Sequence, residues 1–368
     1  MTSLVIFGPH PTGFPDDAQS FLLEGVRVAC GLRQTQAPSF DPDDPADAER
    51  VLVRKRAFSC NYRDRALMLR LAIDAPTESW SPIGSDFVAE VVAVGRAVGG
   101  LRPGDRVIGN AAYPYSGVEG VRAGVPSNQA SRALAVFHQA KLFPIPAAMP
   151  DDLAAGFTIG GQTTYSMIRK LALAPGERVL ITGGRSNTGL FALAALAGRG
   201  VETHVSTTSP RHVESLRRLG AGEVIVVDRE APDFAGHPAV AAVMAAGGYN
   251  AVIDPFADVY LAHAPALMAM GGRYVTCGVF DQHSALTGEK VTTNRPPASL
   301  LLHVLVKNLT LMGNCIGATT DLAEAVADQA AGRLAPPVDS VWSGEDCAAF
   351  LDRGYNAAER FGKVVFRY

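Results

Sequence analysis

The stretch RVLITGGRSNTGLFALAALAGRGVETHVSTTSPRHVESLRRLGA, residues 178–221, decides the fold. An apolar run at 179–181 has the length of a buried strand, and the glycine turn GGRSNTG follows it at 183–189. An alanine- and leucine-rich helix comes next, is stopped by Gly198 and Gly200, and leads into a second β-rich run at 201–206. Strand, turn, helix and strand form one βαβ unit, the half-module that binds a nucleotide. The turn places backbone N–H groups and the positive end of the helix where a pyrophosphate would bind.

The glycine turn follows the GxGxxG pattern incompletely. Gly184 and Gly189 hold the first and last positions, while Ser186 replaces the middle glycine. Serine is small enough for close backbone approach, and its hydroxyl can bond a phosphate oxygen. Because many αβ proteins have such a turn without a ligand, a purely structural turn is the alternative, and the complete βαβ context favours dinucleotide binding. Three further side chains of the turn are expected at the phosphates, Arg185 (with a surface arginine as the alternative), Asn187 and Thr188.

The residues after the second strand favour NADPH over NADH. NAD sites usually place a carboxylate there, which accepts hydrogen bonds from the ribose hydroxyls. This chain instead has Ser206, Thr207, Thr208 and Ser209, with Arg211 just beyond. Hydroxyls and a guanidinium can bind a 2′-phosphate, and no carboxylate repels it. The alternative is a polar turn that caps a helix starting near residue 210.

Composition excludes several classes of function. The chain has 368 residues, enough for two domains, with 48% hydrophobic and 19% charged residues and a net charge of −3. This net charge shows no excess of positive residues that would indicate binding to nucleic acid or to an anionic membrane. No apolar run is long enough to span a bilayer. The amino end lacks the basic and apolar regions of a signal peptide. The five cysteines are scattered singly, without metal-type spacing, which predicts reduced thiols and a cytoplasmic protein.

The chain changes its pattern near residue 150. Residues 1–150 are β-rich and broken by Gly and Pro, and residues from 151 alternate short apolar strands with helices, which is typical of a doubly wound parallel sheet. A helix is predicted over 321–332, and GKVVFRY at the carboxyl end reads as a strand. We therefore expect a nucleotide-binding domain at 151–315 between a β-rich domain at 1–150 and its continuation at 316–368.

Four blocks carry a resemblance to the medium-chain dehydrogenase/reductase superfamily. They are VLVRKRAFSCNYRD (51–64), GSDFVAEVVAVGRAVGGLRPGDRV (84–107), the nucleotide turn, and FGKVVFRY (361–368). The first 50 residues match poorly. The resemblance implies a GroES-like β-barrel domain paired with a Rossmann domain, a substrate that reacts in the cleft between them, and a homodimer.

The zinc ligands of the alcohol dehydrogenases in this superfamily are replaced. The resemblance aligns their cysteine ligand with Asn61 and their Gly-His-Glu with Gly84-Ser85-Asp86, while Cys60 lies one residue off the ligand position. The region of their structural-zinc lobe, 110–129, contains no cysteine. Asn61 and Ser85 are poor zinc ligands, so we expect no metal. The alternative is a zinc alcohol dehydrogenase with altered ligands, in which Cys60 and Asp86 rebuild a site with a histidine.

Without a metal, reduction of an activated C=C bond is the favoured chemistry. Hydride adds to the β-carbon, and ordinary hydrogen bonds can stabilise the negative charge that spreads onto an oxygen. Asn-Tyr-Arg-Asp at 61–64 resembles the turn beside the nicotinamide in zinc-free quinone oxidoreductases and enoyl or acrylyl thioester reductases. Enones, quinones, enoyl thioesters and dehydroamino acids in a modified peptide all stay open as substrates. A non-catalytic nucleotide-binding relative is a further alternative, since fold alone does not establish activity.

The resemblance and the residue chemistry together suggest individual roles. Tyr62 would bond the substrate oxygen and protonate the enolate, or it is a wall residue and water supplies the proton. Asn61 would orient substrate or cofactor through its amide, or it serves as a turn residue. Aromatic residues expected to line the substrate pocket are Phe87, Tyr113 and Tyr115. Residues expected at the cofactor are Thr163, Cys277, Gly278, Val279, Asn314 and Lys363. The alternatives are a hydroxyl bonded to its own backbone for Thr163, a buried thiol for Cys277 and a solvated lysine for Lys363.

Overall fold

The computed structural model describes residues 1–229, 232–280 and 297–368, and they form two compact units. Unit 1 comprises Met1–Ile159 and Pro337–Tyr368, and unit 2 comprises Gly160–Pro336. Both ends of the chain therefore belong to the same unit. None of the helices in the described ranges is long and apolar enough to cross a membrane.

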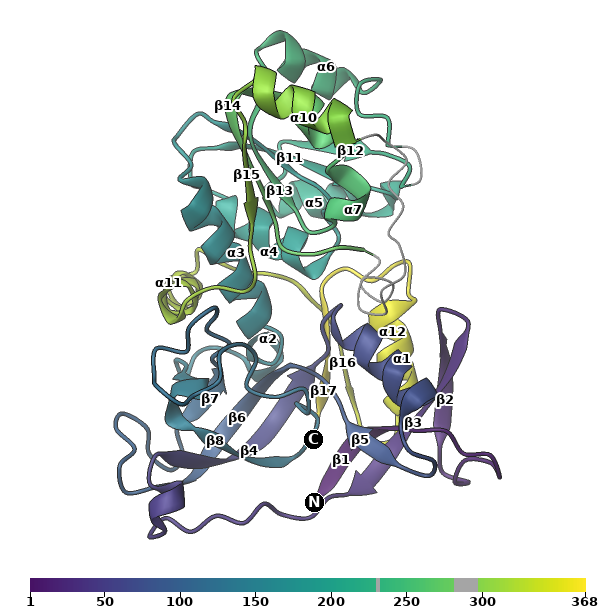
Figure 1. Ribbon diagram of the computed structural model, residues 1–368, viewed down its shortest axis with the longest axis vertical. Coiled ribbons are helices and arrows are strands. Elements are labelled where there is room, and N and C mark those ends of the chain that lie inside the picture. Colours follow the sequence, from purple (N-terminus) through teal and green to yellow (C-terminus); the bar gives the residue numbers. More distant parts are fainter. Residues whose placement is uncertain (230–231, 281–296) are drawn as a thin grey trace. The chain divides into compact units, whose positions relative to one another are not determined.

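Unit 2 is built on a parallel sheet of six strands, in the order β12-β11-β10-β13-β14-β15 (Figure 1). The strands are β10 (Arg178–Ile181), β11 (Glu202–Thr207), β12 (Glu223–Val226), β13 (Tyr249–Asp254), β14 (Met268–Thr276) and β15 (Thr310–Gly313). The strand order reverses between β10 and β13, where side chains such as Val252 and Ile253 are fully buried. This confirms the predicted doubly wound sheet and places its topological switch point, where such sheets bind ligands, at the carboxyl ends of β10 and β13.

Helices cover the faces of this sheet because the connections between parallel strands must cross over it. The described helices between residues 158 and 330 are α3 (Thr158–Leu171), α4 (Asn187–Leu196), α5 (Val213–Arg218), α6 (Pro238–Ala245), α7 (Ala257–Tyr260), α8 (Ala264–Leu267), α10 (Pro297–Val306) and α11 (Thr319–Ala330), and among them α4, α5 and α8 contact the strands. The central helix α4 has almost no polar side chain after its first turn, and every residue from 189 to 196 is buried. A helix that is apolar all round fits only a position covered on several sides.

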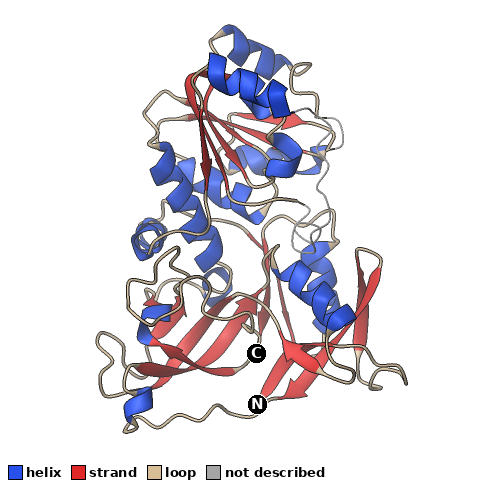
Figure 2. Cartoon of the chain, in the orientation of Figure 1, coloured by secondary structure: helices blue, strands red, loops and turns tan. Residues whose placement is uncertain are grey.

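Unit 1 contains two sheets (Figure 2). The larger has the order β16-β17-β4-β6-β7-β9, with β8 also paired to β4. Its strands are β4 (Arg50–Ser59), β6 (Asp86–Val94), β7 (Arg106–Gly109), β8 (Leu134–His138), β9 (Leu142–Pro144), β16 (Val338–Ser343) and β17 (Lys363–Arg367). The carboxyl-terminal strand β17 pairs with β4, so residues at the start of β17 reach the end of β4. This pairing builds the polar cluster described below.

The second sheet of unit 1 is formed by the amino-terminal residues that sequence patterns left unassigned. Its order is β2-β3-β1-β5, from β1 (Thr2–Phe7), β2 (Gln19–Leu23), β3 (Val26–Gln34) and β5 (Trp80–Pro82), and its pairings are antiparallel. Helices α1 (Asp64–Asp74) and α12 (Cys347–Tyr355) contact this sheet. A short α2 (Asp151–Ala154) and the 3-10 turns Pro45–Asp47 and Gln139–Lys141 complete the unit. Core residues such as Leu4, Phe58 and Phe350 form one cluster that joins both sheets.

Candidate active site

The glycine turn of unit 2 is so tight that its glycines are required for packing. A Cβ on Gly184 would overlap Cγ1 of Val205, and one on Gly189 would lie 2.7 Å from the carbonyl oxygen of Gly183. Gly183 itself has φ of 56°, a conformation that favours glycine. The first and last glycines of the predicted pattern therefore let the start of α4 approach β10 and β11 closely.

Three hydroxyls predicted to contact phosphate are engaged in hydrogen bonds in and beside the turn. Ser186 is the N-cap of α4, and its Oγ accepts a hydrogen bond from Gly189 N at 3.0 Å. The Ser206 hydroxyl is fully buried and accepts from Gly183 N at 3.3 Å. Thr207 is also buried, and its Oγ1 lies 3.3 Å from Ser209 N. These hydroxyls shape the site, whereas the half-buried Thr208 and the exposed Arg211 stay accessible.

Three arginines gather around this turn. Arg185 is half-buried, and its pKa is lowered by burial first and then by the positive charges of Arg229 and Arg211. Arg229 follows β12, and its guanidinium carbon lies 4.4 Å from the centroid of the Phe280 ring. Arg185 and Arg211 were predicted, and sequence reasoning missed Arg229. The sequence could have indicated Arg229, because it comes two residues after the apolar run 224–227. Most of that run lies in β12, which pairs in parallel with β11, so the carboxyl ends of the two strands lie side by side. Clustered positive charge of this kind attracts an anion.

The other residues of unit 2 predicted at the cofactor lie at the ends of β14 and β15, in α3, or at the start of α4. Cys277, Gly278 and Val279 directly follow β14, and burial raises the pKa of the Cys277 thiol to about 12. Asn314 is buried, with Oδ1 accepting from Ser166 Oγ at 2.8 Å and Nδ2 donating to the Ile316 carbonyl at 2.8 Å. In the same unit, Thr163 of α3 is buried. Asn187 is the first residue of α4, and Thr188, which follows it, is half-buried.

A buried acid that sequence reasoning missed lies at the topological switch point of the sheet. Asp254 ends β13 and is fully buried, and its carboxylate accepts from Thr182 Oγ1 at 2.6 Å and Phe256 N at 2.8 Å. The Tyr274 hydroxyl donates to its second oxygen at 2.5 Å. Burial raises the pKa of Asp254 to about 6. This network joins the carboxyl ends of β10, β13 and β14 beside the nucleotide turn.

In unit 1, the ammonium of Lys363 is the centre of a buried polar cluster. Lys363 is 3% exposed, and its Nζ donates to Asn61 Oδ1 at 2.6 Å, Ser59 Oγ at 3.2 Å and the Cys60 carbonyl at 3.2 Å. It also forms an ion pair with Asp86 Oδ2 at 3.3 Å. Lys363 was predicted to approach the cofactor, with a solvated lysine as the alternative. Its burial rules out the solvated alternative, and every bond named here stays within unit 1.

The amide of Asn61 is fully engaged in this cluster. Its Nδ2 donates to Asp86 Oδ2 at 2.8 Å and to Ser85 Oγ at 3.1 Å, while the Ser85 hydroxyl donates to Asp64 Oδ2 at 2.6 Å. Asp64 Oδ2 also accepts from Asn61 N at 2.8 Å, and burial raises the pKa of Asp64. Asn61 thus combines a turn role with a buried side-chain role. Its amide fixes the peptide that carries the next residue, Tyr62.

The residues at the zinc-ligand positions do not fit a zinc ion. Asn61 and Ser85 offer neither a thiolate nor an imidazole, and the Lys363 ammonium is bound to the same Asn61 and Asp86 oxygens that a metal would need. The hydroxyl of Tyr355 donates to the Asn61 carbonyl at 2.9 Å, and burial raises the pKa of the Cys60 thiol, which disfavours the thiolate. Across the described residues, no group of three or more His, Cys, Asp or Glu side chains gathers as metal ligands would.

The aromatic residues predicted for the substrate pocket have different environments. Tyr62 is half-buried in the turn before α1, beneath the guanidinium of Arg65. Phe87 is fully buried and stacks on Phe137 with ring centroids 5.4 Å apart, which favours a core role. Tyr113 is 42% exposed, and Tyr115 is 82% exposed at the edge of a shallow pocket of about 410 Å³.

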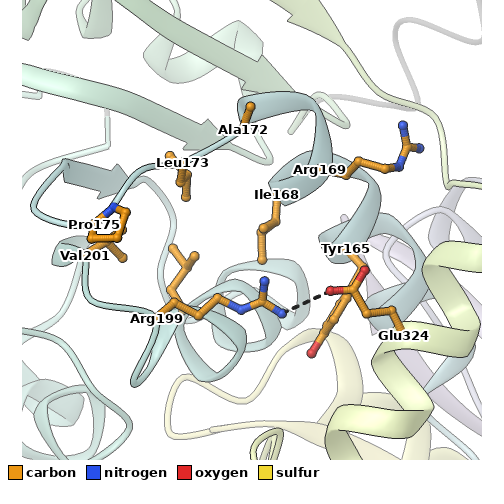
Figure 3. Close-up of a pocket in the computed structure, with 10 residues that line it drawn as sticks. Tyr165, Ile168, Arg169, Ala172, Leu173, Pro175, Arg199, Val201 and Glu324 are labelled. Atoms are coloured by element: carbon orange, nitrogen blue, oxygen red, sulfur yellow. Dashed lines mark hydrogen bonds and ion pairs between the residues drawn. The ribbon is translucent and has the colours of Figure 1, made fainter.

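A pocket of about 480 Å³ in unit 2 contains none of the predicted site residues (Figure 3). Residues of α3, including Tyr165 and Ile168, line it together with Arg199 and Glu324, whose side chains form an ion pair of 3.5 Å. Its lining also includes Pro175 and Val201, which precede β10 and β11. The pocket is therefore at the amino ends of these strands, whereas the glycine turn follows the carboxyl end of β10.

Comparison with known families agrees with both units. Residues 47–147 match the family described as alcohol dehydrogenase GroES-like domain, and residues 188–331 match the family described as zinc-binding dehydrogenase. The chain belongs to the medium-chain dehydrogenase/reductase superfamily. As an oxidoreductase of this superfamily it pairs a GroES-like domain with a Rossmann domain, as predicted. The first 46 residues, with β1, β2 and β3, lie outside both matches.

Two relatives illustrate the range of this superfamily. Acryloyl-coenzyme A reductase of Metallosphaera sedula is 24% identical over 366 residues, which cover 94% of this chain and 99% of that protein. The pikromycin polyketide synthase component PikAII of Streptomyces venezuelae is 27% identical over 275 residues, which cover 74% of this chain. The matched region is only 6% of the length of PikAII.

Solved structures of the superfamily share the fold over the full chain. An NAD-dependent alcohol dehydrogenase has a TM-score of 0.77 at 22% identity, with 100% of both chains covered. Quinone oxidoreductase of Escherichia coli, complexed with NADPH, has a TM-score of 0.70 at 17% identity, again with 100% of both chains covered. The superfamily binds NAD(P), and at these identities the likeness establishes the fold alone.

Proposed function

We propose that this protein is a zinc-independent, NADPH-dependent reductase that transfers hydride to an activated C=C bond. The observation that carries the proposal is the cluster centred on Lys363, where an amide and a hydroxyl stand at zinc-ligand positions and the Lys363 ammonium is bound to Asn61 and Asp86. Alcohol oxidation needs a group that stabilises an alkoxide, which zinc supplies in metal enzymes. Reduction of a conjugated C=C bond needs only hydrogen bonds to the oxygen that gains charge. Acryloyl-coenzyme A reductase, by its name, acts on such a bond.

The arginines around the glycine turn support NADPH as the cofactor. Arg185 is disfavoured in its charged form by burial and by Arg229 and Arg211, and an anion bound among them would relieve this cost. The 2′-phosphate of NADPH carries such a charge, and NADH lacks it. When bound, the cofactor supplies the hydride. In this proposal the turn residues, the half-buried Thr208 and Arg211 hold its phosphates.

Tyr62 and Asn61 have distinct roles in the proposed reaction. The phenol of Tyr62 donates a hydrogen bond to the substrate oxygen, and either this phenol or water then protonates the enolate at its α-carbon. Asn61 positions the Tyr62 peptide, because its side-chain bonds to Ser85, Asp86 and Lys363 fix the turn. Substrates of this class are enones, quinones, enoyl thioesters and dehydroamino acids in modified peptides.

The test is a panel of these acceptors assayed by NADPH absorbance, with and without a chelator. The proposal expects turnover with at least one acceptor class, unchanged by the chelator, and a lower KM for NADPH than for NADH. Loss of turnover with the chelator, together with zinc in the purified protein, would favour an alcohol dehydrogenase with altered ligands. NADPH binding without turnover on any acceptor would favour a non-catalytic relative.

We further propose a homodimer in a reducing, cytoplasmic setting. Strand β15 is at one end of the six-stranded sheet, and Leu311 on it is 39% exposed. Helix α10 precedes it and exposes four large apolar side chains, Leu301, Leu302, Leu305 and Val306. An exposed edge strand beside an apolar patch can pair with a second copy of itself about a twofold axis. Light scattering measures the mass, and replacement of Leu305 by Glu is expected to give a monomer.

A further inference from the structure

The candidate catalytic Tyr62 is covered by a buried guanidinium. The Cζ atom of Arg65 lies 4.4 Å from the centroid of the Tyr62 ring, within the range of a cation–π contact. The Arg65 side chain is 8% exposed and belongs to the first turn of α1. Its backbone N donates to the Tyr62 carbonyl at 3.2 Å, so the same short segment carries both the ring and the cation.

A carboxylate from the amino-terminal sheet holds this guanidinium. Glu24 Oε1 forms an ion pair with Arg65 NH1. Glu24 and Gly25 form the two-residue turn between β2 and β3, with φ of 52° and 78°. Hairpin turns with two positive φ angles prefer Asn or Asp followed by Gly, and a glutamate there adopts an unfavourable backbone conformation. The ion pair offers a physical reason for a glutamate at this position.

We propose that Arg65 is a positioning residue for the reduction, and that Glu24 of the amino-terminal sheet orients it. This inference rests on the proposed function. The guanidinium fixes the Tyr62 ring and stabilises negative charge on its phenol oxygen during proton donation. The hairpin that carries Glu24 lies outside both family matches, so the contact gives these otherwise unassigned residues a role at the candidate site.

In the proposed step, the phenol of Tyr62 gives its proton to the substrate. Hydride from NADPH has formed the C–H bond at the β-carbon and left an enolate. The O–H bond of Tyr62 then breaks, a C–H bond forms at the α-carbon, and a phenolate stays beneath the Arg65 guanidinium until solvent returns a proton. A cation over an aromatic face attracts the ring, and it attracts a phenolate more strongly than a phenol.

Other charged and titratable groups of this part of unit 1 are bound to partners of their own. Arg63 is paired with Asp64 Oδ1 at 3.1 Å and with Asn128 Oδ1 at 2.9 Å. The second oxygen of Asp64 faces Asn61 N and Ser85. Tyr355 of α12 donates to the Asn61 carbonyl.

The kinetic test uses Arg65→Met, Arg65→Lys and Glu24→Gln. The matched control is Arg33→Met, because Arg33 lies 4.6 Å above the Phe7 ring and pairs with Asp17, away from Tyr62 in sequence. We expect Arg65→Met to lower kcat about tenfold with an unchanged KM for NADPH and to move the alkaline limb of the kcat–pH profile to higher pH. Arg65→Lys should restore part of kcat, Glu24→Gln should give a smaller loss, and Arg33→Met should match the parent.

A second measurement decides the inference without turnover. Tyrosines are replaced by 3-fluorotyrosine, and Tyr62→Phe assigns the fluorine resonance of residue 62. The ionisation midpoint of that resonance should rise by about one pH unit in Arg65→Met and stay unchanged in Arg33→Met. An unchanged midpoint in Arg65→Met, or an equal shift in Arg33→Met, overturns the inference. If the Tyr62 midpoint shifts in Arg65→Met but the parent protein reduces no acceptor, the effect of Arg65 on the Tyr62 phenol is supported. Only the proposed function is then rejected.

Discussion

Replacing Lys363 by Met tests the buried cluster most directly. Methionine keeps the aliphatic stem of the side chain but removes the ammonium. This stem packs closely on Gly156, because a Cβ added to Gly156 would lie 2.7 Å from Lys363 Cγ. Among the described residues, the Asp86 carboxylate, whose side chain is 0% exposed, then keeps its bonds from Asn61 Nδ2 and Ile159 N. Breaking a buried ion pair by removing one partner costs about 3–5 kcal/mol, which is a large part of the stability of an ordinary domain.

The assay is urea unfolding followed by tryptophan fluorescence. The chain has two tryptophans, Trp80 and Trp342, and both belong to unit 1, so the signal reports the unit that contains the cluster. We expect Lys363→Met to lower the free energy of unfolding of unit 1 by about 3–5 kcal/mol. Adding Asp86→Asn should recover about 1–2 kcal/mol, since no buried charge is then left without a partner.

Two results would refute this reasoning. A loss below about 1 kcal/mol in Lys363→Met would mean that the ammonium is not a buried partner of Asp86. A double variant as unstable as Lys363→Met would mean that the loss does not arise from the uncompensated Asp86 charge.

Three further predictions concern single positions. Gly184→Ala should abolish NADPH binding in a fluorescence titration, because its Cβ overlaps Val205, whereas Gly222→Ala, with its nearest neighbour at 3.4 Å, should bind normally. Burial raises the pKa of Asp254 to about 6, above its usual 3.8, so unit 2 should lose stability as pH rises from about 4 to about 6. Asp254→Asn should remove this loss, on the order of 3 kcal/mol, in urea titrations followed by circular dichroism. Burial lowers the pKa of Lys55 to about 7, so unit 1 should gain stability from about pH 7 to pH 10, and Lys55→Met should lack this gain in tryptophan fluorescence.

The sequence predicted the nucleotide-binding unit well because its signals are local. The predicted strands at 179–181 and 201–206 correspond to β10 and β11, each within one residue at either end. The domain boundaries at 150 and 315 stay predictions, as do the individual site roles.

The candidate site of unit 1 was predicted only in its parts. Asn61 and the changed zinc-ligand positions were visible because they occur in short blocks with fixed spacing. The bond from Lys363 to Asn61 was not visible, because 302 residues separate the two side chains in sequence. The amino-terminal sheet gave too weak a pattern, and the pairing of Glu24 with Arg65 depends on packing between that sheet and α1.

The sequence by itself determined the βαβ unit and the doubly wound sheet, and its resemblance to the superfamily indicated that zinc-ligand positions are replaced. The unit and the sheet follow from periodicity and from glycines in a tight turn. Only the tertiary structure decided that Lys363 is bound to Asn61 and Asp86, that Arg229 joins the other two arginines, and that Phe87 packs in the core. Such partners come from strands and turns far apart along the chain, and a side chain acquires its burial and its charged neighbours only when those strands pair.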